Sequence, residues 1–142
     1  MSGGKIAGSC LCGAMRFTAR RMSGIVECHC SMCRKAAGGH AGFFFVALRG
    51  DVTWEGAEHL AVYRSSPALE RSFCSRCGTA MTGANLVEPD DTIILAANAL
   101  DGEVAARIIA QEHAASKAPW IEGHDEAPSH DGPYPGWEKL RP

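Results

Sequence analysis

The seven cysteines are the residues of this chain best suited to chemistry, and they form three short clusters. The clusters contain two, three and two cysteines in chain order: Cys10 and Cys12; Cys28, Cys30 and Cys33; Cys74 and Cys77. Structural zinc usually has four protein ligands, whereas catalytic zinc has three and keeps a position open for water or substrate. The clusters therefore predict one closed site with four thiolates and one open site with three.

The spacing inside the clusters suits metal coordination. Cys30 with Cys33, and Cys74 with Cys77, have the Cys-x-x-Cys spacing at which a tight turn brings two thiolates to one ion. Gly78 follows the last cysteine, and glycine accepts the positive φ that such a turn can need. Where two cysteines are two residues apart, we expect them to lie on a strand and to point to the same face.

Spacing alone leaves open which cysteines share an ion. In one arrangement, Cys30 and Cys33 join the third cluster as in a zinc ribbon, and three thiols remain unused. In the other, the first and third clusters share one ion, and the second cluster forms a compact open site. The second arrangement uses every cysteine.

The composition is that of a soluble globular protein of one domain. The chain has 142 residues, of which 46% are apolar and 21% are charged. A formal net charge of −2 gives no electrostatic argument for a nucleic-acid partner. The longest apolar runs are as short as a strand, far below the roughly 20 residues of a membrane-spanning helix. We expect neither nucleic acid nor a membrane as partner.

The redox setting favours metal over disulfides. The N-terminal sequence Met-Ser-Gly-Gly-Lys-Ile-Ala has no apolar stretch of the kind found in signal peptides, so we expect a cytoplasmic protein with reduced thiols. The odd number of cysteines also argues against a framework made only of disulfides.

The elements that must position the cysteines read as strands separated by glycine and proline, which predicts an all-β sheet or barrel-like arrangement. The segment after residue 90 is ambiguous, and we favour a strand to Asn98, a turn at Asp101–Gly102 and one more strand. The expected strands are Met15–Ala19, Gly24–Cys30, Gly42–Leu48, Val52–Glu55, Leu60–Arg64, Leu69–Phe73, 91–98 and Arg107–Gln111.

The C-terminal stretch differs in composition. Five of the seven prolines lie from Pro119 onwards, which predicts an irregular segment. Because this stretch also contains Trp120, Tyr134 and Trp137, we expect it to pack across the body of the domain. The expected organisation is a single domain over residues 1–142, with a core at about 7–122 and a tail at 123–142.

The three clusters in their sequence context resemble a known family. The segments Gly8-Ser-Cys-Leu-Cys-Gly-Ala14, Cys28-His-Cys-Ser-Met-Cys-Arg-Lys35 and Phe73-Cys-Ser-Arg-Cys-Gly-Thr79 are similar to those of the glutathione-dependent formaldehyde-activating enzyme and centromere protein V family. Lys117-Ala-Pro-Trp120 resembles the C-terminal signature of that family. The resemblance covers about residues 7 to 122 and implies an all-β, Mss4-like (β-tent) fold.

The resemblance also implies ligands and a reaction. It implies a structural zinc on Cys10, Cys12, Cys74 and Cys77 and a catalytic zinc on Cys28, Cys30 and Cys33, two zinc ions per chain. The implied activity is that of a carbon–sulfur lyase that activates an aldehyde by combining formaldehyde with glutathione into S-hydroxymethylglutathione. An open zinc site suits this reaction because the ion can bind the thiol sulfur and favour its deprotonated form.

Two other functions fit the same pattern. If a fourth protein ligand such as His29 or His40 closes the second site, the chain is a zinc-stabilised binding module without catalysis. If the cysteines carry no metal, they could act as a redox sensor. Metal content and coordination discriminate between these functions.

The remaining candidates each have a functional and a plain interpretation. His29 is expected to point away from the ligands, and His40 is expected to be an ordinary loop residue. Several basic side chains either meet an anionic substrate or are solvated, and the aromatic side chains are expected to be packing residues, with one face of the phenylalanine run turned outward. These basic and aromatic residues are Arg34, Lys35, His113, Lys117, Phe43, Phe44, Phe45, Trp54, Trp120 and Trp137.

Overall fold

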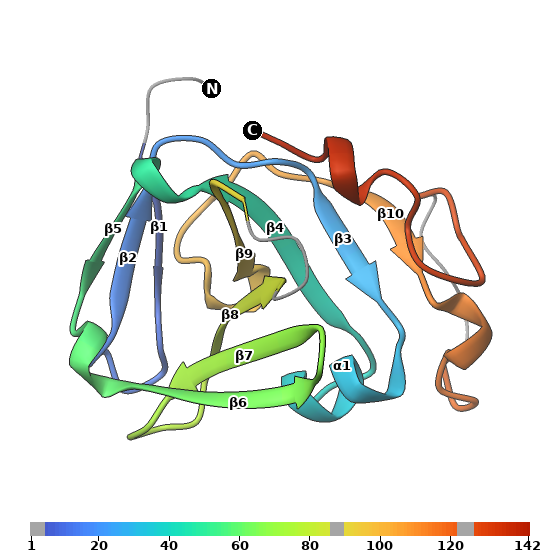
Figure 1. The fold of residues 1–142 in the computed structure, drawn as a ribbon, viewed down its shortest axis with the longest axis horizontal. Helices are drawn as coiled ribbons and strands as arrows, with labels where there is room; N and C mark the ends of the chain where they lie inside the picture. Colours follow the sequence, from blue (N-terminus) through green and yellow to red (C-terminus); the bar gives the residue numbers. More distant parts are fainter. Residues whose placement is uncertain (1–4, 86–89, 122–126) are drawn as a thin grey trace.

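A computed structural model describes residues 5–85, 90–121 and 127–142 of the chain. It is built mainly from strands, with one short α-helix, α1 (Ser31–Ala37), and a few 3-10 turns (Figure 1). None of the helices in these ranges has the length and apolar character needed to cross a membrane. The strands are β1 (Ile6–Ser9), β2 (Arg16–Ala19), β3 (Ile25–Cys28), β4 (Gly42–Leu48), β5 (Val52–Glu55), β6 (Leu60–Ser66), β7 (Leu69–Cys74), β8 (Ala80–Asn85), β9 (Thr92–Ala96) and β10 (Ile108–Glu112).

The strands form two sheets. A three-stranded sheet has the order β1-β2-β5, and a seven-stranded sheet has the order β10-β3-β4-β9-β8-β7-β6. All neighbouring pairs are antiparallel except β10 and β3, which run parallel. The expected all-β class is therefore confirmed.

The hydrophobic core joins the two sheets. Phe17 of β2 packs against Phe45 of β4 with ring centroids 6.5 Å apart, and both side chains are almost fully buried. Met15, Met81 and Leu95 are also fully buried in this cluster. Burying a large apolar side chain contributes roughly 1.5–3 kcal/mol, so this contact fixes the small sheet against the large one. The loops that carry the first and third cysteine clusters are positioned by this packing.

The structure contains every strand expected from the sequence, and it adds three elements. β1 and β8 were not expected, because Gly8 and the small residues around Gly83 have low strand propensity. Both are strands because they pair with neighbours: β1 pairs with β2, and β8 pairs with β7 and β9. Helix α1 follows Cys30 directly, in a segment rich in helix-forming residues, and ends at Gly38 with φ 73°.

The expectation that closely spaced cysteines lie on strands is wrong. β1 ends at Ser9, and Cys10 and Cys12 occupy the turn that follows. β3 ends at Cys28, and Cys30 is the N-cap of α1. The sulfurs are therefore brought together by turns and by a helix, not by strand alternation.

The C-terminal residues make several contacts with the large sheet (Figure 1). The Gln111 N–H donates to the Pro128 carbonyl at 2.8 Å, and the His130 N–H donates to the Gln111 carbonyl at 2.9 Å. Near the end of the chain, the Arg141 guanidinium donates to both carboxylate oxygens of Asp91, at 3.0 and 2.8 Å. Trp120 differs from the expectation that it packs, because it is 70% exposed.

Candidate metal centre

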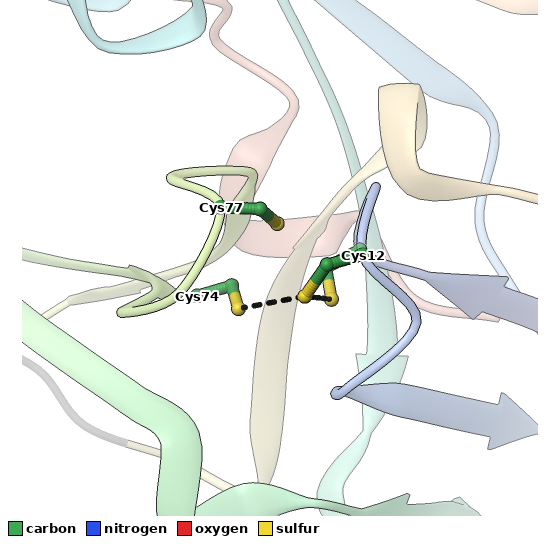
Figure 2. A group of neighbouring side chains, drawn as sticks. Cys12, Cys74 and Cys77 are labelled. Atoms are coloured by element: carbon green, nitrogen blue, oxygen red, sulfur yellow. Dashed lines mark hydrogen bonds between the residues drawn. The ribbon is translucent and has the colours of Figure 1, made fainter.

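The first and third cysteine clusters meet in space. The ligand atoms of Cys10, Cys12, Cys74 and Cys77 all lie within 4.8 Å of one another. The Cys12 sulfur is 3.6 Å from that of Cys10 and 3.9 Å from that of Cys74. Figure 2 shows Cys12 pointing from one loop toward Cys74 and Cys77, which lie on another loop. Sulfurs bound tetrahedrally to zinc at about 2.3 Å are about 3.8 Å apart, so the separations fit one ion.

The two loops that carry these cysteines are built alike. The N–H of Gly13 donates to the Cys10 carbonyl at 3.0 Å, and the N–H of Gly78 donates to the Cys74 carbonyl at 2.8 Å. Both glycines have positive φ, 79° for Gly13 and 80° for Gly78, so the expectation for Gly78 is confirmed. The positive φ lets each loop turn tightly after its second cysteine.

Thr79 links the two loops, although the sequence pattern did not point to it. Its hydroxyl oxygen accepts a hydrogen bond from the Leu11 N–H at 3.0 Å and lies 3.2 Å from the Cys77 sulfur. The signal available in the sequence was its position directly after Cys-x-x-Cys-Gly. A side chain that bonds a ligand atom helps to orient that ligand.

The surroundings of Cys77 and Cys10 favour the thiolate, the form that binds metal. The pKa of Cys77 is lowered to about 5, first by the Thr79 hydroxyl and then by backbone groups. Burial acts to raise the pKa of Cys10, but the hydrogen bond from the Met15 N–H, together with neighbouring thiols, leaves it lowered. Cys12 differs: a backbone hydrogen bond acts to lower its pKa, but burial and the neighbouring thiols raise it to about 11. All seven cysteines are free thiols. Four convergent soft sulfur donors are the ligand set of structural zinc.

The second cluster lies elsewhere, so Cys74 and Cys77 are grouped with the first cluster and not with Cys30 and Cys33 as in a ribbon. Cys28 ends β3, Cys30 is the N-cap of α1, and Cys33 lies in the first turn of α1. All three line one cavity of about 740 Å³. Cavities of roughly 300–1,000 Å³ are typical of small-molecule sites.

One group of possible ligand atoms in this cavity includes residues that the sequence did not point to as ligands. Cys28, Glu112 and His113 have ligand atoms within 4.8 Å of one another, a spacing that the three cysteines of the second cluster do not share. Glu112 and Cys28 are buried, while the His113 side chain is 35% exposed. Cys30 and Cys33 line the same cavity as Cys28, but the three cysteines do not form one group with all ligand atoms this close.

The thiols of Cys28 and Cys33 form a hydrogen bond, and their pKa values are shifted in opposite directions. The hydrogen bond with Cys33 raises the pKa of Cys28, and the same contact lowers the pKa of Cys33 to about 6. Arg71 of β7 acts in the same direction on Cys33, because its Nη2 lies 3.5 Å from the sulfur. The Nε of Arg71 donates to the Ser65 hydroxyl at 2.9 Å, which fixes the guanidinium at the cavity wall.

Glu112 is held by the C-terminal segment. The Trp137 Nε1 donates to its Oε2 at 2.6 Å. Burial raises the pKa of Glu112 to about 7, although the hydrogen bond from Trp137 acts to lower it. A side chain near the C-terminus thus positions a carboxyl group beside the second cysteine cluster.

The other two candidate histidines lie outside both groups of possible ligands. His29 is fully buried, and its Nε2 lies 2.6 Å from a carboxylate oxygen of Glu27. Its Nδ1 has no hydrogen-bond partner within the described part of the chain. The ring of His40 is 6.1 Å from that of His29 and 5.9 Å from that of Phe43. The contacts of His29 are those of a residue that supports the loop between Cys28 and Cys30.

The remaining candidates have structural or peripheral positions. Phe45 is in the core, whereas Phe44 lines the large cavity and also a smaller one of about 380 Å³ that shares Arg71 with it. The Arg34 guanidinium lies over the Trp120 ring at 6.0 Å. Lys35 is exposed, Lys117 is half-buried, and Trp54 packs on Phe17. Among the described residues, the lining of both cavities excludes Arg34, Lys35 and Lys117.

Known proteins are similar to this chain in sequence. Residues 5–117 match the family model described as "Glutathione-dependent formaldehyde-activating enzyme". A Halomonas elongata protein described as "Putative glutathione-dependent formaldehyde-activating enzyme" is 41% identical over 87 residues, which covers 54% of each chain. The present chain thus spans about half the length of this curated relative.

A solved structure shares the architecture. The crystal structure of a Rhodobacter sphaeroides protein superposes with a TM-score of 0.57 at 24% sequence identity, covering 70% of this chain and 91% of that one. At this level of identity the likeness concerns the fold alone. It agrees with the expected all-β, Mss4-like (β-tent) class.

Proposed function

Because the chain belongs to the glutathione-dependent formaldehyde-activating enzyme family, we propose that it is a zinc-dependent carbon–sulfur lyase that joins a small-molecule thiol to an aldehyde. In this reaction the thiol sulfur bonds to the aldehyde carbon, and the thiol proton passes to the aldehyde oxygen. With glutathione and formaldehyde the product is S-hydroxymethylglutathione, and no other reactant is needed. The lyase direction breaks the same carbon–sulfur bond.

The observation that carries this proposal is the cavity that contains the second cysteine cluster. Three thiols at the wall of a cavity of about 740 Å³ have room for a substrate beside them, whereas the four thiols of the other site converge on one another. We assign the structural zinc to Cys10, Cys12, Cys74 and Cys77 and the catalytic zinc to Cys28, Cys30 and Cys33. Zinc at the second site would supply a positive charge that favours the deprotonated form of a thiol.

The side chains of the cavity suit a small peptide thiol. Glutathione carries carboxylates and an ammonium group, and the wall offers charged side chains of both signs. Arg71 is a fixed guanidinium for a carboxylate, while Asp90 and Glu138 are acidic. Phe44 and Ile94 form part of an apolar surface of the cavity wall. The free thiols suit the reducing cytoplasm, the location that we propose.

A second function is favoured by one specific contact. Glu112 and His113 lie close enough to Cys28 to act as ligands, so protein side chains could close the second site. If no substrate thiol can displace them from the ion, the chain would be a zinc-stabilised binding module. Catalysis separates the two functions, because a closed site that never admits a thiol cannot accelerate the reaction.

The test uses the purified full chain with zinc, glutathione and formaldehyde. Exchange between formaldehyde and S-hydroxymethylglutathione is followed by NMR, with and without protein. We expect the protein to accelerate exchange, Cys28→Ser to reduce the rate to that without protein, and Ser31→Ala to retain it. Ser31 is a matched control because it is exposed on α1 and does not line the cavity.

Two results would contradict the proposal. If wild-type protein loaded with two zinc ions leaves the exchange rate unchanged, the binding-module function is favoured. If Cys28→Ser retains full activity while the four-cysteine site stays loaded, the second cluster does not carry the reaction.

A further inference from the structure

The end of β10 places two potential ligands next to Cys28. β10 runs parallel to β3, and Glu112 pairs with Cys28 in the register of the two strands. The His29 N–H donates to the Glu112 carbonyl at 3.0 Å, which fixes this register at the strand end. Side chains of paired residues in neighbouring strands lie on the same face of a sheet, so the Glu112 carboxyl is held on the side of the Cys28 thiol.

His113 reaches the same point because the backbone turns there. In a continuing strand, residue 113 would point to the opposite face from residue 112. His113 instead has φ 52°, and it is the one non-glycine residue with positive φ within the ranges that the structure describes. Its N–H donates to the Gly132 carbonyl at 2.8 Å, so the C-terminal segment holds this conformation. The left-handed turn is costly for a residue with a Cβ, and such strain is concentrated at functional sites.

The distances match two ligands of one ion. The His113 Nε2 lies 3.4 Å from Glu112 Oε1, and both residues have a ligand atom within 4.8 Å of the Cys28 sulfur. Nitrogen and oxygen ligands at about 2.0–2.1 Å from a tetrahedral zinc ion are about 3.4 Å apart. An isolated ion pair would explain the contact between His113 and Glu112, but it would not require the cysteine at the same point.

The orientation of Glu112 is supported from outside the site. Its second oxygen, Oε2, accepts the hydrogen bond from Trp137 Nε1 at 2.6 Å. This contact leaves Oε1 toward His113. Metal-binding carboxylates are commonly fixed by hydrogen bonds of this kind.

We propose that Glu112 and His113 are ligands of the metal ion held by Cys28, so that the second site has mixed sulfur, oxygen and nitrogen coordination. The inference deepens the proposed function and rests on its assignment of a metal to this cavity. Its chemical consequence is that Glu112 and His113 complete the coordination in the absence of substrate, so that a substrate thiol must displace one of them to reach the ion. His113, the more exposed of the two, lies on the solvent side of the site.

The experiment uses cobalt(II) alone as probe on the full chain. Wild type, Glu112→Gln, His113→Ala and Cys28→Ser are titrated with cobalt, and affinities are measured by competition with a chelator. The ligand-field spectrum of each bound ion is recorded. The matched control is His59→Ala, because His59 also follows a glutamate, with 3.8 Å between its Nε2 and Glu58 Oε1, but does not line the cavity.

We expect two cobalt ions per wild-type chain. Glu112→Gln and His113→Ala should each lower the binding affinity of one ion by at least about tenfold and change the spectrum of that ion, as loss of a metal-supporting residue commonly does. Cys28→Ser should abolish binding of the same ion. His59→Ala should leave the affinity and the spectrum of both ions unchanged. The second ion, in the four-cysteine site, reports that each variant is folded.

The inference is overturned if both variants bind two ions with wild-type affinities and spectra, or if wild type binds one ion. The exchange assay on the same samples separates this inference from the proposed function. Catalysis without the spectral effect rejects the mixed coordination and leaves the function standing. The spectral effect without catalysis supports the mixed coordination and rejects the lyase.

Discussion

At the scale of single residues, a few side chains that touch cysteines or their neighbours determine how the thiols are presented. Thr79 joins the loop of Cys10 and Cys12 to that of Cys74 and Cys77 through one hydroxyl group. Arg71 places a cation beside Cys33, and Trp137 holds the carboxyl group of Glu112. These contacts are not visible from spacing, because each joins segments that are distant in the sequence.

The contact of Thr79 leads to a residue-scale prediction. Thr79→Val removes the hydroxyl but keeps the shape of the side chain, so the four-cysteine site should lose about 10–100-fold in zinc affinity. Chelator competition measures the loss, and Thr79→Ser should restore most of the affinity because it keeps the hydroxyl. Equal affinities of wild type and Thr79→Val would show that the hydroxyl does not orient Cys77.

At the scale of elements, turns and a short helix replace strands as the carriers of the ligands. The first and third clusters lie on similar turns that end in a glycine with positive φ. In the second cluster, Cys30 and Cys33 are three residues apart at the start of α1, and positions with that separation lie on one side of a helix. The Cys-x-x-Cys spacing is therefore satisfied by two different local structures in one chain.

Gly78 provides an element-scale prediction. A Cβ at this position would meet no atom within 4 Å, so Gly78→Ala introduces backbone strain without a clash. Because φ is 80°, we expect a loss of about 1–2 kcal/mol in the free energy of unfolding. Urea unfolding of the zinc-loaded protein measures the loss.

The matched control for Gly78→Ala is Gly50→Ala. A Cβ at Gly50 would also meet no atom within 4 Å, and the φ of Gly50 lies outside the left-handed range. This substitution should therefore leave stability unchanged or slightly raised. Equal effects of the two substitutions would contradict the argument from φ.

At the scale of the whole molecule, the four-cysteine site connects the two sheets. Cys10 follows β1 of the small sheet, while Cys74 ends β7 of the large sheet. Cys10 and Cys74 are also buried in the common core with Phe17 and Phe45. A metal ion at this point would act as a crosslink between the sheets, beside the apolar contact that already joins them.

Metal removal tests this role of the site. Zinc bound to folded protein contributes its binding free energy to folding, about 10–16 kcal/mol in small zinc-finger peptides. We therefore expect a strong chelator to lower the unfolding temperature and to abolish the near-ultraviolet circular dichroism of the core aromatic residues. Re-addition of zinc should restore both signals.

An unchanged unfolding temperature after metal removal would contradict this role. If chelation removes both ions and the unfolding temperature stays the same, the apolar contacts alone hold the sheets together. Cys28→Ser serves as a control, because loss of the second site should affect stability less than loss of the four-cysteine site.

Much of the fold could be predicted from local pattern. The runs Gly42–Leu48 and Val52–Glu55 are strands because β-branched and aromatic residues favour a pleated, half-buried surface. β1 and β8 could not be predicted in this way, since Gly8 and Gly83 become strand residues through their neighbours. The turns of Gly13 and Gly78 are local, and the sequence pointed to the second of them.

The sequence by itself determined the sulfur inventory, the all-β class and the family, because residue types, their spacing and local propensity are properties of the linear chain. Only the tertiary structure decided which clusters meet, since Cys12 and Cys74 are brought together by the packing of two sheets. It also decided that Glu112 and His113 lie beside Cys28. That contact depends on the parallel pairing of β10 with β3 and on a left-handed residue held by the C-terminal segment, neither of which leaves a pattern in the sequence.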